Sequence, residues 1–349
     1  MLILLIVVLL LSFYLLAKVI ERYFVDSLDK IAAKLKMSSD AAGATLMAAG
    51  SSAPELFIAL FAVFRHGNHE AIGIGTIVGS AIFNILAITG AVAVVKKALI
   101  AWQAVIRDLV FYAVAVLLLI ILFKDGKVEW SDAALFIGIY LIYIVVVVFW
   151  RKIFNYVDPN EEKQEIKKNI DNSKFVKKIT SPLDFVLDKI FPKPEKYYAI
   201  FFISIFIIAA LSWVLVESAI GIAHILNISE AVIAITILAV GTSVPDLFSS
   251  VIVSKQGRGG MAISNAIGSN IFDILIGLGL PFLLIILITG ENINLNIDNL
   301  NMSVQFLLAS VVVLLGLFII NKWVVGKKMG VFLILLYIAY IVWAVINVG

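Results

Sequence analysis

Two acidic stretches that match each other lie inside otherwise apolar sequence, one in each half of the chain. Residues 44–57 and 235–248 are identical at seven of fourteen positions, and Glu55 in the first corresponds to Asp246 in the second. Each acid directly follows a proline, which breaks helices. A carboxylate at the centre of a bilayer costs about 2.5–3.5 kcal/mol even on lenient insertion scales. The two acids therefore indicate a buried cation site around which the rest of the fold is built.

The surrounding composition indicates a membrane protein. The chain has 349 residues, of which 62% are hydrophobic, and its mean hydropathy is +1.08; a soluble domain is nearer half apolar. Because there is no cysteine, disulfides and thiolate metal sites are excluded. The three histidines fall in predicted loops, which argues against a His-rich transition-metal site. The first apolar run has no basic start and no small-residue cleavage site, so we expect a retained first span and not a signal peptide.

A window of about 20 apolar residues crosses the hydrocarbon core, and ten such windows can be drawn. We therefore expect an all-α polytopic membrane protein with ten transmembrane helices. The predicted spans are 2–21, 40–64, 71–95, 103–123, 131–150, 198–217, 229–253, 261–288, 302–321 and 329–347.

Basic residues predict the orientation. With both termini external, 24 of the 27 Lys and Arg residues fall on the cytoplasmic side, as the positive-inside rule requires; this count places Arg107 in a loop. We expect residency in the cell (plasma) membrane. The one long polar stretch, 152–197, is predicted to be a cytoplasmic linker between a first unit, 1–151, and a second, 198–349.

A second pair of matching stretches shows that the chain is a repeat. Residues 77–86 and 266–275 are identical at six of ten positions, at nearly the same offset as the first pair. Each half then holds five spans. Because five is odd, equivalent spans enter the membrane from opposite sides, and the halves are inverted-topology repeats, an arrangement typical of transporters with a midplane site.

Oxygen-bearing residues recur at helical spacing around the acids. Pro54 and Pro245 are expected to break their helices and release carbonyl groups. The side-chain candidates are hydroxyl, amide and carboxylate groups three or four positions apart, and so lie on shared helix faces. They are Ser52, Glu55, Ser80, Asn84, Ser243, Asp246, Ser269 and Asp273. An all-oxygen set of this kind suits Na⁺ and Ca²⁺, which are hard cations.

Each candidate also has a structural interpretation. Serine and glycine in membrane helices are usually packing devices, and Asn84 alone could be an interhelical hydrogen bond. Asp40, Glu217 and Glu230 lie near predicted span ends, where capping or solvation explains them. Ser38 and Ser229, equivalent in the repeat, are predicted N-caps.

At these residues the chain resembles the calcium/cation antiporter superfamily, and within it the sodium/calcium exchangers, most of all the potassium-dependent ones. The strings that carry the resemblance are GATLMAAGSSAPELF at 43–57, GTIVGSAIFN at 75–84, GTSVPDL at 241–247 and GSNIFD at 268–273. The resemblance implies central carboxylates at Glu55 and Asp246, completed by the other six side chains named above. It also implies main-chain carbonyl ligands at Ala48, Ser51, Ala239 and Thr242.

The same resemblance bears on the coupled ions. Asp273 occupies the position where potassium-dependent members carry Asp, although prokaryotic relatives carry Asp there without needing K⁺. Proton-coupled members usually read Gly-Asn-x-x-Glu at the motif, which this chain lacks. The central loop is too short for the calcium-sensor domains of animal exchangers.

We therefore expect a secondary antiporter and not an enzyme, exchanging Na⁺ for Ca²⁺ by alternating access, with coupling to K⁺ or H⁺ left open. No prosthetic group, nucleic acid or obligate protein partner is implied; the partners are the transported ions and the lipid bilayer. A Ca²⁺/H⁺ antiporter on the same fold is the main alternative. A channel and an intramembrane aspartyl protease are further alternatives, but the protease would need a Gly-x-Gly-Asp motif that is absent.

Overall fold

The computed structural model describes residues 1–35, 37, 39–65, 69–122, 124, 126–154, 187, 189–255, 257–294 and 301–347. Most of the predicted linker 152–197 and the predicted cap Ser38 lie outside these residues. The linker and the two unit boundaries therefore stay predictions.

Within the described residues, nine helices are long and apolar enough to cross a membrane, and a bent helix pair makes a tenth span. The ten-span prediction is confirmed. In the first half the helices, with η marking a π-helical turn, are α1 (Leu2–Val19), η1 (Ile20–Phe24), α2 (Val25–Lys34), α3 (Ser39–Ala42), η2 (Gly43–Met47), α4 (Ala48–Ser51), α5 (Ala53–Phe64), α6 (Glu70–Phe83), η3 (Asn84–Ile88), α7 (Thr89–Val95), α8 (Trp102–Leu122) and α9 (Trp130–Phe154).

The second half repeats this plan. Its helices are α12 (Tyr197–Leu226), α13 (Glu230–Ile233), η5 (Ala234–Leu238), α14 (Ala239–Thr242), α15 (Val244–Lys255), α16 (Gly259–Phe272), η6 (Asp273–Leu278), α17 (Gly279–Thr289), α18 (Asn301–Ile320) and α19 (Lys327–Asn347).

Some predicted boundaries were wrong. Helix α12 continues to Leu226, nine residues past the expected end, and stops where Asn227 takes a left-handed conformation (φ 53°, ψ 44°), a common helix terminator. Glu217 therefore lies inside this helix, where it pairs with Arg65, and His224 lies in its last turn. Arg107, expected in a loop, lies inside α8 with only 2% of its surface exposed.

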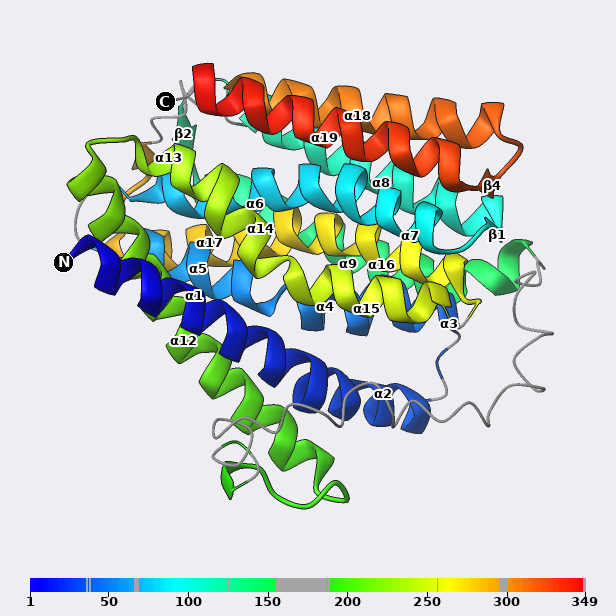
Figure 1. Cartoon of the computed structure of the whole chain (residues 1–349), viewed down its shortest axis with the longest axis horizontal. Helices are drawn as coiled ribbons and strands as arrows, with labels where there is room; N and C mark the ends of the chain where they lie inside the picture. Colours follow the sequence, from blue (N-terminus) through cyan, green and yellow to red (C-terminus); the bar gives the residue numbers. More distant parts are fainter. Residues whose placement is uncertain are drawn as a thin grey trace.

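Two short strand pairs join the halves. Strand β1 (Ala98–Leu99) pairs antiparallel with β4 (Val324–Val325), and β2 (Lys127–Val128) pairs with β3 (Ile293–Asn294). Each pair takes one strand from each half, and the two pairs lie at opposite ends of the bundle (Figure 1). This exchange of strands at both ends is what an inverted repeat produces.

Glycines allow helices of opposite halves to meet closely. A Cβ added at Gly79 in α6 would lie 2.6 Å from the carbonyl oxygen of Ile235 in η5. A Cβ added at the equivalent Gly268 in α16 would lie 2.7 Å from the carbonyl oxygen of Ala44 in η2. Only glycine fits such backbone contacts, so these two positions fix how the repeats dock.

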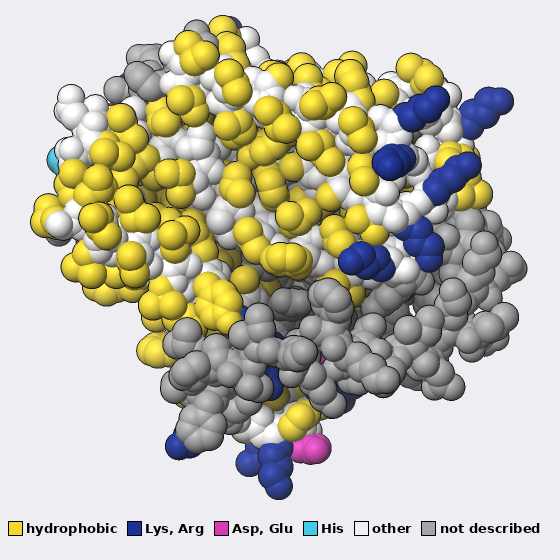
Figure 2. Space-filling model, in the orientation of Figure 1, with side chains coloured by type: hydrophobic (Ala, Val, Ile, Leu, Met, Phe, Trp, Pro, Cys, Tyr) yellow, Lys and Arg dark blue, Asp and Glu magenta, His cyan; other side chains and the backbone are white. Residues whose placement is uncertain are grey.

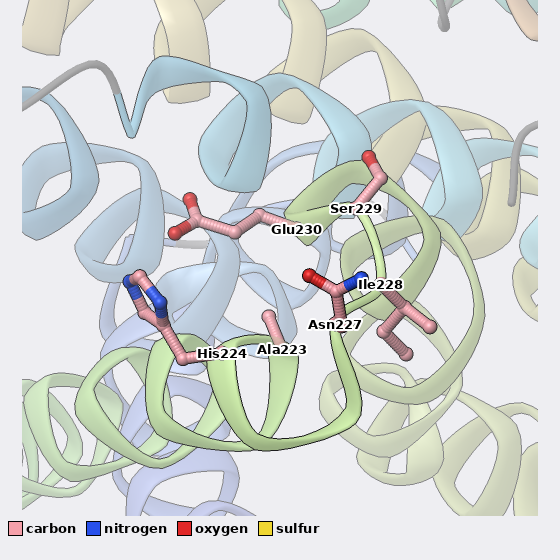
Figure 3. A pocket seen from close by; sticks show the side chains of 6 residues that line it. All are labelled: Ala223, His224, Asn227, Ile228, Ser229 and Glu230. Atoms are coloured by element: carbon pink, nitrogen blue, oxygen red, sulfur yellow. The ribbon is translucent and has the colours of Figure 1, made fainter.

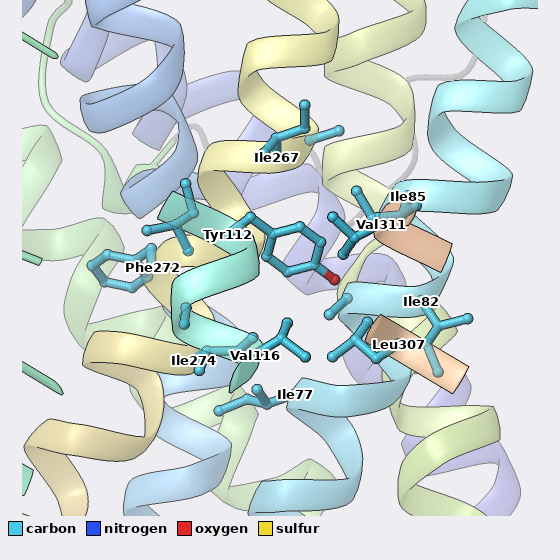
Figure 4. Packing of buried hydrophobic residues seen from close by; sticks show 14 of the residues in the cluster. Ile77, Ile82, Ile85, Tyr112, Val116, Ile267, Phe272, Ile274, Leu307 and Val311 are labelled. Atoms are coloured by element: carbon cyan, nitrogen blue, oxygen red, sulfur yellow. The ribbon is translucent and has the colours of Figure 1, made fainter. Parts of the chain in front are cut away.

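Large apolar side chains fill the space behind these contacts. Tyr112 of α8 is fully buried in the largest cluster of buried hydrophobic residues, which includes Ile82, Val116 and Leu307 (Figure 4). Helices α1 and α12 lie side by side along one edge of the bundle (Figure 1). Both termini lie at one end of the molecule.

The outer surface suits a bilayer. Hydrophobic side chains cover most of the visible face, and Lys and Arg gather toward the end opposite the termini (Figure 2). Many large apolar side chains of α1, α9 and α12 are exposed. Such an exposed apolar surface is typical of a face that contacts a membrane.

Candidate functional site

Two broken helices position the central acids. Ser52 interrupts the helix between α4 and α5 (φ −86°, ψ 6°), and Ser243 interrupts the helix between α14 and α15 with nearly the same angles (φ −86°, ψ 2°). The first pair bends by 50°. Pro54 lies within the first two residues of α5, where its missing N–H breaks no intrahelical bond. Glu55 and Asp246 fall in the first turns of α5 and α15, where the helix dipole favours negative charge.

A π-helical turn accompanies each candidate segment. Asn84 begins η3 and Asp273 begins η6, at equivalent repeat positions. The turns η2 and η5 likewise precede the two breaks at equivalent positions. Single π-helical turns inside α-helices occur frequently at functional sites, so their fourfold recurrence here marks this region.

Serine hydroxyls link the two halves across the centre. Ser80 and Ser243 are hydrogen-bonded through their Oγ atoms at 2.8 Å, and Ser52 and Ser269 form the equivalent contact. Both contacts join a broken helix of one half to the following helix of the other. The four predicted serines therefore come together in two symmetry-related pairs.

Serine hydroxyls lie against all three carboxylates. Ser243 Oγ donates to Glu55 Oε1 at 3.3 Å. Ser269 Oγ donates to Asp246 Oδ2 at 3.0 Å. Ser80 Oγ lies 3.4 Å from Asp273 Oδ2.

The other oxygen of each carboxylate is left over. Among the described residues, Glu55 Oε2, Asp246 Oδ1 and Asp273 Oδ1 have no hydrogen-bond partner, and neither does Asn84 Oδ1. All four side chains have 0% exposure. An unpaired buried polar atom is costly, and more so when it is charged. These four oxygens are therefore available to coordinate a cation.

Charge around the site is unbalanced. No Lys, Arg or His of the described chain forms an ion pair with Glu55, Asp246 or Asp273. The three acids do not, however, form a compact metal-binding group of their own in the part of the chain described. Serine hydroxyls lie between them, so any ion held here would share its shell between carboxylates and neutral oxygens.

The four predicted main-chain ligands lie at the ends of two short helices. Ala48 and Ser51 begin and end α4, and Ala239 and Thr242 begin and end α14. The carbonyl of Ala48 accepts from the Ser52 N–H at 3.0 Å, and that of Ala239 accepts from the Ser243 N–H at 3.3 Å. Their equivalence fits the repeat, and their role as ligands stays a prediction.

Asn270 also belongs to this cluster, although it was not among the predicted site residues. Asn84 Nδ2 donates to Asn270 Oδ1 at 3.0 Å and lies 3.4 Å from Asp246 Oδ2. Asn270 Nδ2 in turn donates to the Ala81 carbonyl at 2.9 Å. Its position directly after the predicted Ser269, in a helix that is almost entirely buried, was the available signal.

A buried ion pair in α8 was also missed. Arg107 Nε donates to Asp108 Oδ1 at 2.7 Å, and the Tyr143 hydroxyl donates to the same oxygen at 3.1 Å. The Tyr143 hydroxyl also lies 3.5 Å from the Ala44 carbonyl in η2. This network therefore connects α8 and α9 to the segment that leads into the first helix break.

A surface pocket near the start of α13 is separate from these acids. Its lining includes His224, Asn227 and Glu230 (Figure 3). The Glu230 carboxylate already pairs with His69 Nδ1 at 2.9 Å. Ser229 caps α13 by accepting from a backbone N–H, which confirms the predicted N-cap.

Comparison with known proteins gives one consistent result. A family profile described as "Sodium/calcium exchanger protein" matches residues 5–149 and 196–346. The human protein "Sodium/potassium/calcium exchanger 4" is 29% identical, with 95% of this chain and 79% of the relative covered. Human "Sodium/potassium/calcium exchanger 3" is 30% identical, with 96% and 79% covered. A solved structure of the sodium-calcium exchanger NCX_Mj, soaked with Na⁺ and Sr²⁺, has a TM-score of 0.64 at 26% identity and covers 98% of this chain and 99% of its own.

Proposed function

The chain belongs to the sodium/calcium exchanger family, and we propose that it is a secondary antiporter that exchanges Na⁺ for Ca²⁺ at the buried oxygen cluster between its repeats. The observation that carries this proposal is the set of unpartnered oxygens on Glu55, Asp246 and Asp273. They lie on buried acids that no basic side chain of the described residues neutralises. Buried carboxylates of this kind are stable in lipid when cations or protons neutralise them.

Charge balance explains why two different ions would alternate there. Three ionised carboxylates carry a charge of −3, which three Na⁺ neutralise. One Ca²⁺ leaves about −1, which a K⁺ or a proton could cancel. Since the same oxygens would serve both loads, Na⁺ and Ca²⁺ exclude each other, and that competition constitutes exchange.

Helix α1 is well placed to control access to the site. Gly50 and Gly241 directly precede the two helix-break regions. A Cβ added at Gly50 would meet Phe24 and Leu28, and one added at Gly241 would meet Phe13. One continuous helical segment thus covers both break regions. We propose that α1 and its equivalent α12 move together against the core and expose the site to each side in turn.

The charge distribution supports one orientation. The end where Lys and Arg gather lies opposite both termini (Figures 1 and 2). By the positive-inside rule this end would face the cytosol. Both termini would then be external, and the protein would reside in the plasma membrane.

Ion flux in reconstituted vesicles tests the proposal. An outward-directed Na⁺ gradient should drive Ca²⁺ uptake, and collapsing the gradient should abolish it. The substitutions Glu55→Gln and Asp246→Asn should each remove the flux. Glu129→Gln, which removes an exposed carboxylate directly before α9, serves as the matched control and should leave the flux unchanged.

Two further arms separate the coupling schemes. Loss of flux when K⁺ is withdrawn would indicate that K⁺ neutralises the charge of about −1 that remains when one Ca²⁺ is bound. Loss on adding a protonophore, with no response to Na⁺, would instead support the Ca²⁺/H⁺ alternative and overturn Na⁺ coupling.

A further inference from the structure

Helices α15 and α16 form a ladder of polar pairs that continues beyond the central acids. In this antiparallel pair, Ser269 of α16 faces Asp246 of α15 and donates to it at 3.0 Å. Four residues after Asp246 on α15 and four residues before Ser269 on α16, Ser250 faces Asn265. Asn265 Nδ2 donates to Ser250 Oγ at 3.3 Å. The second pair lies one helical turn away, about 6 Å at 1.5 Å per residue.

The second pair leaves an oxygen unpartnered. Asn265 and Ser250 both have 0% exposure. Within the described part of the chain, Asn265 Oδ1 has no hydrogen-bond partner. A buried amide oxygen left without a partner destabilises the fold, so a plain packing role does not account for it.

The equivalent turn of the first half offers no such oxygen. There the positions that follow the Glu55 turn are Ala59 on α5 and Thr76 on α6. Thr76 Oγ1 donates to the Ile72 carbonyl of its own helix at 2.7 Å. A Cβ added at Gly73 would lie 2.9 Å from the Ala59 Cα, so the helices pack tightly here. The polar extension belongs to one side of the site only.

That side is the basic end of the molecule. Helix α15 runs from the Asp246 turn to Lys255, and α16 starts at Gly259 after a short connection. Lys96 Nζ donates to the Lys255 carbonyl at 3.2 Å. Ser254, the second-last residue of α15, is 1% exposed and donates to the Val92 carbonyl at 3.3 Å. The ladder is therefore closed at its outer end in this structure.

We propose that Asn265, supported by Ser250, forms an auxiliary cation-coordinating position through which a dehydrated Na⁺ or Ca²⁺ passes between the central acids and the basic end. This inference rests on the proposed antiport function. A neutral amide oxygen replaces part of the hydration shell without adding charge, so it stabilises an ion in transit and still releases it. The opposite side has no counterpart, which makes the two access routes chemically different.

Side-resolved Ca²⁺–Ca²⁺ exchange tests this inference, because it requires no Na⁺ coupling. The vesicles should hold the protein in one sorted orientation, with ⁴⁵Ca²⁺ supplied to one side at a time. Asn265→Leu keeps the approximate size and removes the oxygen. We expect kcat/KM for Ca²⁺ to fall about tenfold on the basic side, the loss of one neutral ligand, and to change less than twofold on the other side.

Two more variants make the test independent of folding losses. Thr76→Val, at the equivalent position of the first half, should change neither side. Asn265→Asp is isosteric and adds charge, so it should lower the KM for Ca²⁺ on the basic side and slow turnover by retaining the ion. If Asn265→Leu does not yield folded protein, the inference is decided by whether Asn265→Asp changes the KM for Ca²⁺ on the basic side only.

The outcomes distinguish the inference from the function beneath it. Suppose that the wild-type protein exchanges ions normally. If Asn265→Leu then changes kcat/KM for Ca²⁺ equally on both sides, or leaves it unchanged on the basic side, only the auxiliary position is overturned. Wild-type protein that carries no Ca²⁺ under any condition would instead refute the proposed function and the inference with it.

Discussion

A single added methyl group at Gly268 would test whether docking of the repeats controls the candidate site. In Gly268→Ala the new Cβ would lie 2.7 Å from the Ala44 carbonyl oxygen and 3.0 Å from the Ala44 Cα. Ordinary contacts begin near 3.4 Å, so α16 and η2 must separate by about 0.7 Å. Both contacting atoms are backbone, and no rotamer change relieves them.

The magnitude follows from two opposing terms. Overpacking a close contact costs about 1–3 kcal/mol, and replacing glycine by alanine in a helix returns about 1 kcal/mol. We expect a net loss of up to about 2 kcal/mol in the free energy of unfolding. The displacement also separates Ser52 from Ser269, the residue next to Gly268. A shift of this size in a binding constellation should weaken Ca²⁺ affinity about tenfold.

Thermal unfolding of the purified protein with and without Ca²⁺ measures both effects. The matched control is Gly316→Ala in α18, where an added Cβ would meet nothing within 4 Å. The control should be as stable as the wild type or more so, with unchanged Ca²⁺ affinity. The reasoning would be refuted if Gly268→Ala behaved like Gly316→Ala in both measurements.

Three other substitutions have defined outcomes. Ser243→Ala removes the donor to Glu55 and should weaken Ca²⁺ binding about tenfold in isothermal titration; unchanged binding would exclude Ser243 from the site. Asp108→Leu leaves Arg107 as a buried charge without its acid and should cost about 3 kcal/mol of stability in chemical unfolding; a neutral result would show that the pair is dispensable. Ser229→Ala removes the α13 cap and should cost about 1 kcal/mol by thermal unfolding, with any larger effect pointing to a role beyond capping.

Much of the fold was predictable because the signals are periodic and repeated. Apolar windows gave the ten spans, and Pro54 and Pro245 gave the two breaks, which the structure places at Ser52 and Ser243. The matching stretches in the two halves, together with the odd number of spans in each half, predicted the inverted repeat. Helical spacing predicted that Ser52 and Glu55 share a helix face, whereas the structure puts Ser52 at the break directly before α5. The spacing could not say which helix of the other half the two residues contact.

The missed features depend on tertiary contacts or on small shifts in hydrogen bonding. A π-helical turn changes only the register of the backbone hydrogen bonds, and no residue type predicts it. Arg107 was assigned to a loop because the positive-inside rule treats basic residues as exposed. Its burial is stabilised by Asp108, whose Oδ1 accepts from both Arg107 and Tyr143, and Tyr143 lies 35 positions away from that acid. Asn265 could not be singled out from the sequence, because its contact with Ser250 depends on how α15 and α16 pack.

The most direct test of the shared-site account is calorimetric titration of Ca²⁺ into the purified protein at increasing Na⁺ and constant ionic strength. The account predicts one Ca²⁺ per chain without Na⁺, and an apparent Kd that rises with Na⁺ steeply enough to require displacement of more than one Na⁺. The combined substitutions Glu55→Gln and Asp246→Asn should abolish this heat. Ca²⁺ binding that is indifferent to Na⁺, or that survives loss of both carboxylates, would contradict it.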